Sequence, residues 1–444
     1  MTAGSLDHAE ALGARPIGRL LWHMCSQTTL SVGIYGVYAL TNAWFVARGV
    51  GETALAAVNL AAPVLLLLGA VSTTVGVGGA SLVSRALGAR RPDDAARAAG
   101  TSLVVFWIAA VVMTVVGLAA IDPILMLLGA GDTTLPYARP YATVLVAGAV
   151  FSTGFSAIVR AEGRIRFSVL LWVVPVLVQI TLDPLLIFGL GMGVTGAALG
   201  TVGGQAVSAF MAVWFFFVQR RRPYRIRMRH LRPRASLVGK VLAIGAPSFL
   251  AGFGATLLVA IVNVRLAALG PVAGTVALAA FAVGTRIQTF VTMPQLGITQ
   301  GVQPIVGYNA GRGLVERVDR TRRLSLGATL GYGVIAAIAV EIAAEPLVAA
   351  FVTDTPTADA ATTALRVLAL GFVFAGVPPL MSAYFQALGE AGPSYLISIG
   401  TLLALKIPLV LMLGMLGPLG VWIGLAVGEL LSAAAALVVL RRRG

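Results

Sequence analysis

An acidic residue interrupts an otherwise apolar stretch at residues 179–188, which read QITLDPLLIF. The residue is Asp183, and apolar positions continue on both sides of it. An ionised carboxylate near the middle of a bilayer costs roughly 2.5 to 3.5 kcal/mol on insertion scales, so such residues are rarely accidental. The stretch therefore predicts a functional site, provided that the chain spans a membrane.

The composition of the whole chain is that of a membrane protein. Of its 444 residues, 58% are hydrophobic and only 11% are charged, whereas a soluble domain carries about 25% charged residues. The single cysteine, Cys25, excludes an intramolecular disulfide, and three scattered histidines predict no metal site. Residues 1–16 lack the basic start and apolar core of a signal peptide, so we expect the N-terminus in the cytoplasm.

Long apolar runs predict about twelve membrane-spanning helices, because a helix needs about 20 mostly apolar residues to cross the hydrocarbon core. In the first half they lie near residues 20–45, 54–83, 98–121, 138–159, 167–188 and 194–218. In the second half they lie near residues 238–266, 273–303, 324–344, 361–388, 395–414 and 420–440. The pattern predicts an all-α polytopic membrane protein.

Arginine clusters fall in every second connection between these spans, including the long run from Arg220 to Arg234 and the last three arginines, Arg441, Arg442 and Arg443. By the positive-inside rule, we expect these connections and both termini to be cytoplasmic, in a multi-pass protein of the plasma (inner) membrane. The formal charge of +15 raises the alternative of nucleic-acid binding. We instead predict that residues 220–236 form an Arg-rich cytoplasmic linker that contacts anionic lipid headgroups, with no nucleic-acid partner.

The two halves of the chain resemble each other. GASLVSRALGAR from Gly79 lies against GVQPIVGYNAGR from Gly301, an offset of 301 minus 79, or 222. DPLLIFGLGMGVTGAALG from Asp183 lies against IPLVLMLGMLGPLGVWIG from Ile407, an offset of 407 minus 183, or 224. Such a duplication predicts two pseudo-symmetric six-helix bundles, at residues 1–219 and 237–444. Parallel repeats of this kind are typical of secondary transporters.

Several polar residues are predicted to lie near Asp183. Gln179 is one helical turn earlier on the same face, and Thr201 and Asn42 can lie at a similar depth in neighbouring spans. Carboxylate, amide and hydroxyl oxygens suit a proton or a hard cation such as sodium, so sodium at Asp183 is one interpretation although no firm metal site is predicted. The alternative is that Asp183 caps a helix end beside Pro184 in contact with water.

Further polar candidates lie in the apolar spans of the second half. Arg286 and Lys406 could form a gate or compensate helix-end carbonyls, and structural roles are the alternative for both. The complete set of cavity or gate candidates is Arg286, Gln300, Gln303, Asn309 and Lys406, with Glu429 as a further buried polar residue.

The chain resembles the multidrug and toxic compound extrusion (MATE) transporters. The resemblance rests on YALTNAWFVARGVGETALAAVNLAAP from Tyr38, GGASLVSRALGARRPDDA from Gly78, LDPLLIFGLGMGVTGAALGT from Leu182, MPQLGITQGVQPIVGYNAGR from Met293 and YFQALGEAGPS from Tyr384. It implies a secondary active antiporter that exports amphipathic, mainly cationic, drugs or metabolites by alternating access in exchange for protons or sodium.

The same resemblance implies a cation site at Asp183, Gln179, Thr201 and Asn42. Two of these positions depart from the family pattern, because Asn42 stands where an aspartate is common and Gln179 where an asparagine is common. Asp183 is then the only acid of the cluster, which weakens the expectation of a two-carboxylate proton relay and indicates altered ion coupling.

Two other functions remain as alternatives. A lipid-linked precursor flippase belongs to the same broad superfamily, but such proteins often have extra spans and a strongly cationic cavity. A membrane enzyme is less well supported, because the sequence contains no HExxH, GxSxG or P-loop motif. We expect a monomer that needs no cofactor, with a small organic molecule and membrane lipids as its partners.

Overall fold

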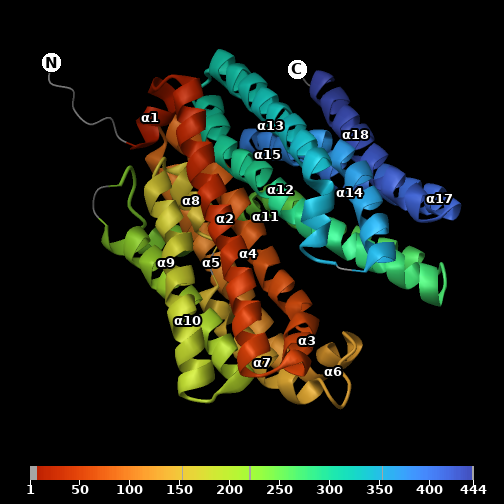
Figure 1. Cartoon of the computed structure of the whole chain (residues 1–444). Coiled ribbons are helices and arrows are strands. Elements are labelled where there is room, and N and C mark those ends of the chain that lie inside the picture. Colours follow the sequence, from red (N-terminus) through yellow and green to blue (C-terminus); the bar gives the residue numbers. More distant parts are fainter. Residues whose placement is uncertain (1–7, 153, 220–221, 353, 443–444) are drawn as a thin grey trace. The chain divides into compact units, whose positions relative to one another are not determined.

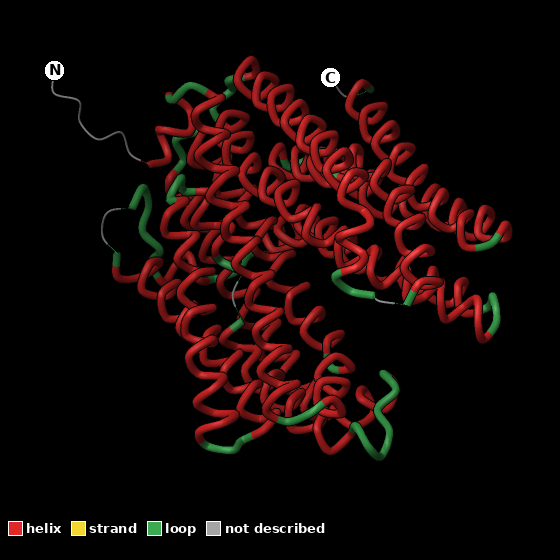
Figure 2. Tube along the Cα trace, in the orientation of Figure 1, coloured by secondary structure: helices red, strands yellow, loops and turns green. Residues whose placement is uncertain are grey.

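The computed structural model describes residues 8–152, 154–219, 222–352 and 354–442, with the side chains of residues 35 and 38–40 left aside. Throughout these ranges the regular structure is helical, without a strand (Figures 1 and 2). Arg220, Arg221 and Arg443 of the basic clusters lie outside the described residues.

The long helices match the predicted spans. Among the described residues, eleven helical segments are long and apolar enough to cross a membrane. They are Glu52–Gly88, Pro92–Ala119, Leu135–Ala161, Ile165–Gly189, Gly193–Val218, Ala235–Ala267, Pro271–Gly311, Val315–Ala349, Thr355–Leu388, Ala391–Leu416 and Pro418–Arg441. Helix α2 (Ile17–Gly49), with 33 residues, is long enough to be a twelfth span. The prediction of an all-α polytopic membrane protein with about twelve spans is confirmed.

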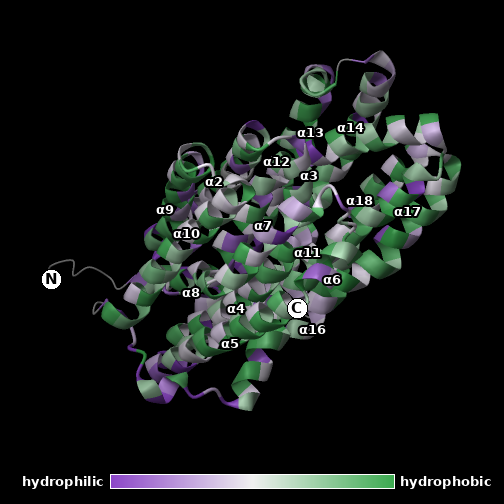
Figure 3. Cartoon of the chain, turned by 90° about the horizontal axis from the view of Figure 1, so that it is seen from below, coloured by the Kyte–Doolittle hydropathy of each residue, from purple (hydrophilic) through white to green (hydrophobic). Residues whose placement is uncertain are grey.

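Colouring by hydropathy shows why these segments are helical spans (Figure 3). The long helices are mostly hydrophobic, and hydrophilic residues gather mainly at helix ends and in connections. The hydrocarbon core of a bilayer holds no water that could bond to backbone N–H and C=O groups. A helix pairs these groups within its own segment, so an apolar segment can cross the bilayer as a helix.

The chain divides into two compact units. Unit 1 comprises residues 1–14, 30–246 and 307–313, and unit 2 comprises residues 15–29, 247–306 and 314–444. Three of the five unit boundaries therefore fall inside continuous helices, namely α2, α11 (Ala235–Ala267) and α12 (Pro271–Gly311), and the other two fall between helices. The division into bundles at residues 219 and 237 stays a prediction.

Unit 1 contains the C-terminal part of α2, the start of α11 and the end of α12. Its other α-helices are α1 (His8–Ala14), α3 (Glu52–Leu60), α4 (Ala62–Gly88), α5 (Pro92–Ala119), α6 (Ile121–Leu127), α7 (Leu135–Ala147), α8 (Ser156–Ala161), α9 (Ile165–Pro184) and α10 (Gly193–Val213). Short 3-10 or π-helical turns are η1 (Gly148–Phe151), η2 (Leu185–Gly189), η3 (Trp214–Val218) and η4 (Met228–Leu231).

Unit 2 contains most of α11 and α12 and all later helices. These are α13 (Val315–Ala349), α14 (Thr355–Ala375), α15 (Val377–Leu388), α16 (Ala391–Tyr395), α17 (Ile407–Leu413) and α18 (Pro418–Arg441), with η5 (Leu396–Gly400), η6 (Leu402–Lys406) and η7 (Gly414–Leu416). Its buried apolar residues form two clusters, one centred on α13 and α14 and one on α11, η6 and α18.

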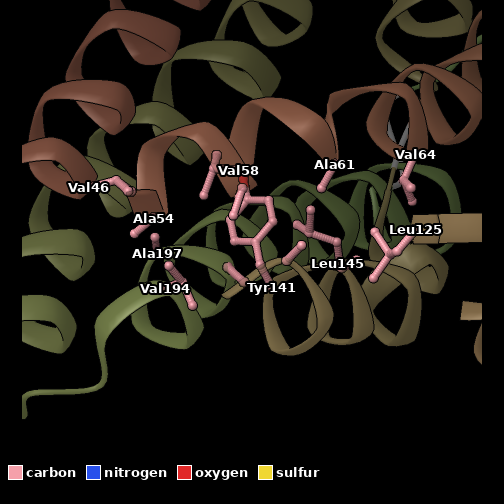
Figure 4. Close-up of a cluster of buried hydrophobic side chains, with 14 of the residues drawn as sticks. Val46, Ala54, Val58, Ala61, Val64, Leu125, Tyr141, Leu145, Val194 and Ala197 are labelled. Carbon is pink, nitrogen blue, oxygen red and sulfur yellow. The ribbon is translucent and has the colours of Figure 1, made fainter. Parts of the chain in front are cut away.

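An apolar cluster fills one end of unit 1 (Figure 4). Tyr141 and Leu145 of α7 point toward Val58 and Ala61 on and just after α3, and all four are buried. Burying apolar side chains in this way is favourable by about 25 cal/mol per Å² removed from water. Val46 of α2 and residues Ile187 and Ala197 continue the same cluster toward α9 and α10.

The basic run between the halves is partly folded into unit 1, and its contact with lipid headgroups stays a prediction. The side chains of Arg222 and Glu162 are 1% and 0% exposed and form an ion pair. The Arg222 guanidinium also lies 4.6 Å from the ring centre of Tyr224, and the Tyr224 hydroxyl donates to Glu162. Burial and the charge of Glu162 raise the pKa of Tyr224 well above its ordinary value. We call Glu162, Arg222 and Tyr224 the linker clasp.

A second acid, Asp93, contacts residues 229 and 230 of the same basic run. Asp93, at the start of α5, pairs with Arg229 at 2.6 Å and contacts the buried His230 at 3.0 Å. Arg229 and Asp93 are 58% and 45% exposed, so water screens their charges and the pair contributes little to stability. The two contacts of Asp93 nevertheless join this part of the run to the start of α5.

Candidate cation site

Helices α9 and α10 approach closely because glycines recur on one face of α10. Gly196, Gly200 and Gly204 are four residues apart, and a Cβ atom would crowd α9 at Gly200 and Gly204 and η2 at Gly196. At Gly204 it would lie 2.6 Å from the Pro175 carbonyl oxygen, and at Gly200 it would collide with the carboxylate of Asp183. Small residues at such spacing let membrane helices pack backbone against backbone. The glycines thus create the space that Asp183 occupies.

The structure brings together Asp183 and the three residues predicted to lie near it. The Asn42 side-chain amide, from α2, donates to Asp183 Oδ2 at 3.2 Å. The Gln179 amide donates to the same oxygen at 3.4 Å and to the hydroxyl of Thr201 at 3.1 Å. All four side chains are buried, and Asp183 is 1% exposed. Their assignment as a cation site stays a prediction.

The two oxygens of the Asp183 carboxylate differ in their surroundings. Oδ2 accepts from two neutral amides, whereas Oδ1 is buried and has no hydrogen-bond partner. Two neutral donors compensate only part of the cost of a buried charge, and no cationic side chain pairs with Asp183 among the described residues. The carboxyl group therefore has one unbonded oxygen, Oδ1, which lies against Gly200 of α10.

An unbonded carboxylate oxygen can take up a proton or a small hard cation. A proton on Oδ1 would neutralise the carboxylate, and a sodium ion would be held by carboxylate, hydroxyl and amide oxygens. The described residues contain no group of three or more His, Cys, Asp or Glu side chains that could hold a more highly charged metal. With the amide nitrogens facing Asp183, the proton fits the arrangement more directly.

An apolar layer lies one helical turn beyond the polar cluster. Val46 and Ile187 lie four residues after Asn42 and Asp183, and Ala197 lies four residues before Thr201. Each is therefore about one helical turn from its polar partner, on the same helix face. All three apolar residues belong to the cluster at the end of unit 1, where Val46 and Ala197 point into its core (Figure 4). The cluster separates Asp183 from that end of the unit.

The other candidates do not form one site. Lys406 pairs with Glu429 at 2.6 Å, while Arg286 is exposed and Gln300 is partly buried. Gln303 donates to Gln386 at 3.2 Å, within unit 2. Asn309, in unit 1, donates to the backbone of Leu12 at 3.1 Å and so fastens α1.

Sequence reasoning missed two polar partnerships. Gln386, which is 1% exposed, exchanges hydrogen bonds with Ser248 as well as accepting from Gln303. Glu162 and Arg222, 60 residues apart, form the linker clasp. An acid within a basic turn, in RAEGR from Arg160, was the available signal for the second.

Comparisons with known proteins agree on one family. The sequence profile of the MatE family matches residues 28–185 and 247–412, which is more than half of the chain. The multidrug export protein MepA of Staphylococcus aureus (strain MRSA252) is 25% identical over 430 residues, covering 96% of this chain and 94% of that protein.

Solved structures give the same result. An outward-facing multidrug resistance MATE family transporter of the MOP superfamily superposes with a TM-score of 0.92 and 26% identity, covering 99% of this chain and 98% of that one. A MOP superfamily transporter from Pyrococcus furiosus, described as having a binding pocket of reverse polarity that suggests a different function, superposes with a TM-score of 0.91 and 25% identity, covering 99% of this chain and 98% of that one.

Proposed function

The chain belongs to the MatE family, and we propose that it is a multidrug efflux antiporter that exports amphipathic, mainly cationic, small molecules in exchange for protons or sodium by alternating access. Membership of this family places it among transporters rather than enzymes. Export of several drugs is taken from the printed description of the similar MepA proteins.

The observation that carries the coupling proposal is that Oδ1 of Asp183 is buried and has no hydrogen-bond partner. A carboxylate buried to 1% exposure, with neutral donors on one oxygen only, is stable when a cation occupies the other. Loss of that cation leaves a charge that favours hydration or a replacement cation. Such an exchangeable charge is what a pump needs in order to couple an ion gradient to conformational change.

We favour the proton as the coupling ion. Both neighbouring amides present N–H groups to Asp183 Oδ2, and the cluster has a single acid because residue 42 is asparagine. A sodium site would need the amides turned so that their oxygens face the ion. Val46, Ile187 and Ala197 separate Asp183 from the end of unit 1 that the apolar cluster fills. This supports release of the proton in the opposite direction.

The remaining features of the proposal follow from the charge pattern. Arginine clusters in every second connection support cytoplasmic termini in a plasma (inner) membrane protein. We further propose that the protein acts as a monomer in contact with membrane lipids, and that residues 220–236 are the cytoplasmic linker between two six-helix bundles in the sequence, residues 1–219 and 237–444.

Efflux from proteoliposomes tests the proposal. A fluorescent organic cation is loaded, and a pH gradient and a sodium gradient are imposed separately. We expect the pH gradient to drive export by the native protein and Asp183→Asn to lower the coupled rate by at least about tenfold, because the exchangeable charge is lost while the shape remains.

The control is Asp359→Asn, which removes an acid that is exposed at the start of α14 and should leave export unchanged. Export driven by sodium alone would reassign the coupling ion. Coupled export at the native rate by Asp183→Asn would show that Asp183 is not the coupling group. Movement of a lipid-linked sugar instead of the dye would favour the flippase alternative.

A further inference from the structure

Arg286 of α12 is an exposed cation near the middle of a predicted membrane span, residues 273–303. Across the described parts of the chain, its side chain forms no ion pair or hydrogen bond with another residue. A guanidinium is a permanent cation, and facing lipid at such a depth is costly. Charged residues within spans almost always face the bundle interior or a water-filled cavity. Because Arg286 is exposed rather than inside the bundle, we expect water to reach it.

Hydroxyl groups continue the same exposed face of α12. Thr289, three residues after Arg286, is exposed, and Thr285, one residue before it, is partly exposed. Their hydroxyls donate to the carbonyls of Thr285 and Ala282, at 2.8 and 3.0 Å respectively. Because these protons are bonded to the helix backbone, the hydroxyl oxygens can only accept hydrogen bonds from another molecule. Arg286 therefore supplies the positive charge of this face.

The exposed face of α13, in the same unit, has the opposite character. Ile335, Ile338 and Ile342 recur there at spacings of three and four residues, and all three are exposed. An apolar face at this spacing is typical of a helix side that contacts lipid. The polar face of α12 does not fit that environment, so we expect it to line an aqueous path.

An exposed aromatic ring lies beside the cation. Phe290 is four residues after Arg286, about one turn along the same side of α12. A guanidinium binds a carboxylate through paired charge-assisted hydrogen bonds, and it repels other cations. An aromatic ring can cover the apolar body of the same molecule. Arg286 and Phe290 together therefore fit an amphipathic molecule with an anionic group better than they fit a plain cation.

We propose that Arg286 is a specificity-determining residue, which favours substrates that carry an anionic group such as a carboxylate. This inference rests on the proposed function and narrows its substrate class from cations to zwitterions. A zwitterion has the positive group expected of the substrates and adds the group that Arg286 binds. The ring of Phe290 contacts its apolar body.

Binding of two matched dyes to the purified protein tests the proposal. A zwitterionic rhodamine with a free carboxylate is compared with the methyl ester of the same dye, which is a cation of nearly the same shape. Fluorescence polarisation gives both values of Kd. We expect the native protein to bind the zwitterion more tightly, and Arg286→Gln to weaken that binding by about tenfold without weakening binding of the ester. Equal affinities of the native protein for both dyes would overturn the proposal.

Two further variants separate a local contact from an effect of net charge. Arg286→Lys keeps the charge and should retain most of the preference for the zwitterion. Arg320→Gln removes one positive charge from an exposed position near the start of α13, outside the predicted span 324–344, and should change neither Kd. An equal loss of zwitterion binding in Arg320→Gln and Arg286→Gln would contradict a direct contact with Arg286.

Cysteine labelling tests access of water to the same position. Cys25 is the only cysteine of the chain, so Cys25→Ser gives a background without thiols. In proteoliposomes of this background, Arg286→Cys should react with a hydrophilic thiol reagent supplied on both sides, and Ile338→Cys should not. Failure of Arg286→Cys to react would mean that the face of α12 is closed to water, which would overturn the proposal.

Export of the same two dyes distinguishes this proposal from the proposed function. Selective binding of the zwitterion without export of either dye would contradict the transporter function while supporting the role of Arg286. Export of both dyes at rates that Arg286→Gln leaves equal and unchanged would support the transporter and overturn selection by Arg286.

Discussion

Asp183 in unit 1 and Glu429 in unit 2 are both carboxylates in the last two spans of their halves, yet their surroundings are opposite. Asp183 has neutral amides on one oxygen and no partner on the other. Glu429 on α18 has a permanent cation, because Lys406 of η6 contacts it at 2.6 Å. A glycine packs against a charged side chain in both places. Gly200 of α10 lies against Asp183, and Gly428 of α18 lies against Lys406.

The difference shows how the same helix pair can serve two purposes. A carboxylate that is paired with a cationic side chain, as Glu429 is with Lys406, gains little from binding a further cation. A carboxylate without one can exchange a proton or a sodium ion as conditions change. The comparison therefore assigns ion exchange to unit 1, and a fixed charge pair to unit 2, as a hypothesis that mutations can test.

The largest expected effect comes from closing the space at Asp183. In Gly200→Ala the new methyl group collides with the Asp183 carboxylate, which has to move away from Asn42 and Gln179. We expect at least about a tenfold loss of coupled efflux, measured in proteoliposomes, because small displacements of a positioned group are costly.

Gly428→Ala is the matched control for this change. Its methyl group would lie 3.3 Å from Cγ of the flexible Lys406 side chain, which can adjust. Efflux should stay close to the native rate. Equal losses in both variants would show that the glycines serve only helix packing and that the comparison between the two sites is mistaken.

A moderate effect is expected from breaking the charge pair of unit 2. Lys406→Met leaves Glu429 without its cation, and the free energy of unfolding should fall by about 2 kcal/mol. The pair is 18% exposed on each side, so the loss is smaller than for a fully buried pair. Unfolding by titration with a denaturing detergent measures it.

The double variant Lys406→Met, Glu429→Leu should recover most of that loss, because replacing a buried pair by apolar residues is often neutral. Coupled efflux should remain in the double variant if the pair is structural. Loss of ion coupling in a stable double variant would instead give unit 2 a part in ion exchange.

The smallest effect concerns the residue at position 42. Asn42→Asp replaces a donor to Asp183 with a second carboxylate, and the repulsion between them is relieved when a proton is shared. The pH at which efflux is half-maximal should rise by about 1 unit. Efflux measured across a pH series checks this, with Asn59→Asp, on the neighbouring α3, as a control for added charge. An unchanged pH profile would separate Asn42 from the coupling step.

The spans and the polar cluster could be predicted because each follows from local patterns. Long apolar runs predicted most helix ends to within about five residues, although α13 begins at Val315, 9 residues before the predicted 324. The spacing of Gln179 from Asp183 predicted that both lie on one face. The Lys406 and Glu429 pair could not be predicted, since it depends on how α18 is set against η6. The packing of Lys406 against Gly428 and the π-helical turn η6 determine how α18 lies against η6, and neither has a clear sequence signal.

The basic run shows a second limit of sequence reasoning. Its composition suggested a surface segment, but Arg222 is buried between Glu162 and the aromatic residues Phe215, Phe216 and Tyr224. A count of charges cannot tell whether an arginine meets lipid or an acid 60 residues earlier. Only the acid in the turn after α8 could have indicated the pairing.

The linker clasp has a practical consequence for dividing the gene. A chain cut at residue 220 would leave Glu162 in one fragment and Arg222 and Tyr224 in the other, exposing a buried acid. A cut after Leu231, beyond the contacts of Asp93 with Arg229 and His230, keeps both acids with their partners. Separately encoded fragments 1–231 and 232–444 are therefore the better starting point for reconstituting the transporter from two polypeptides.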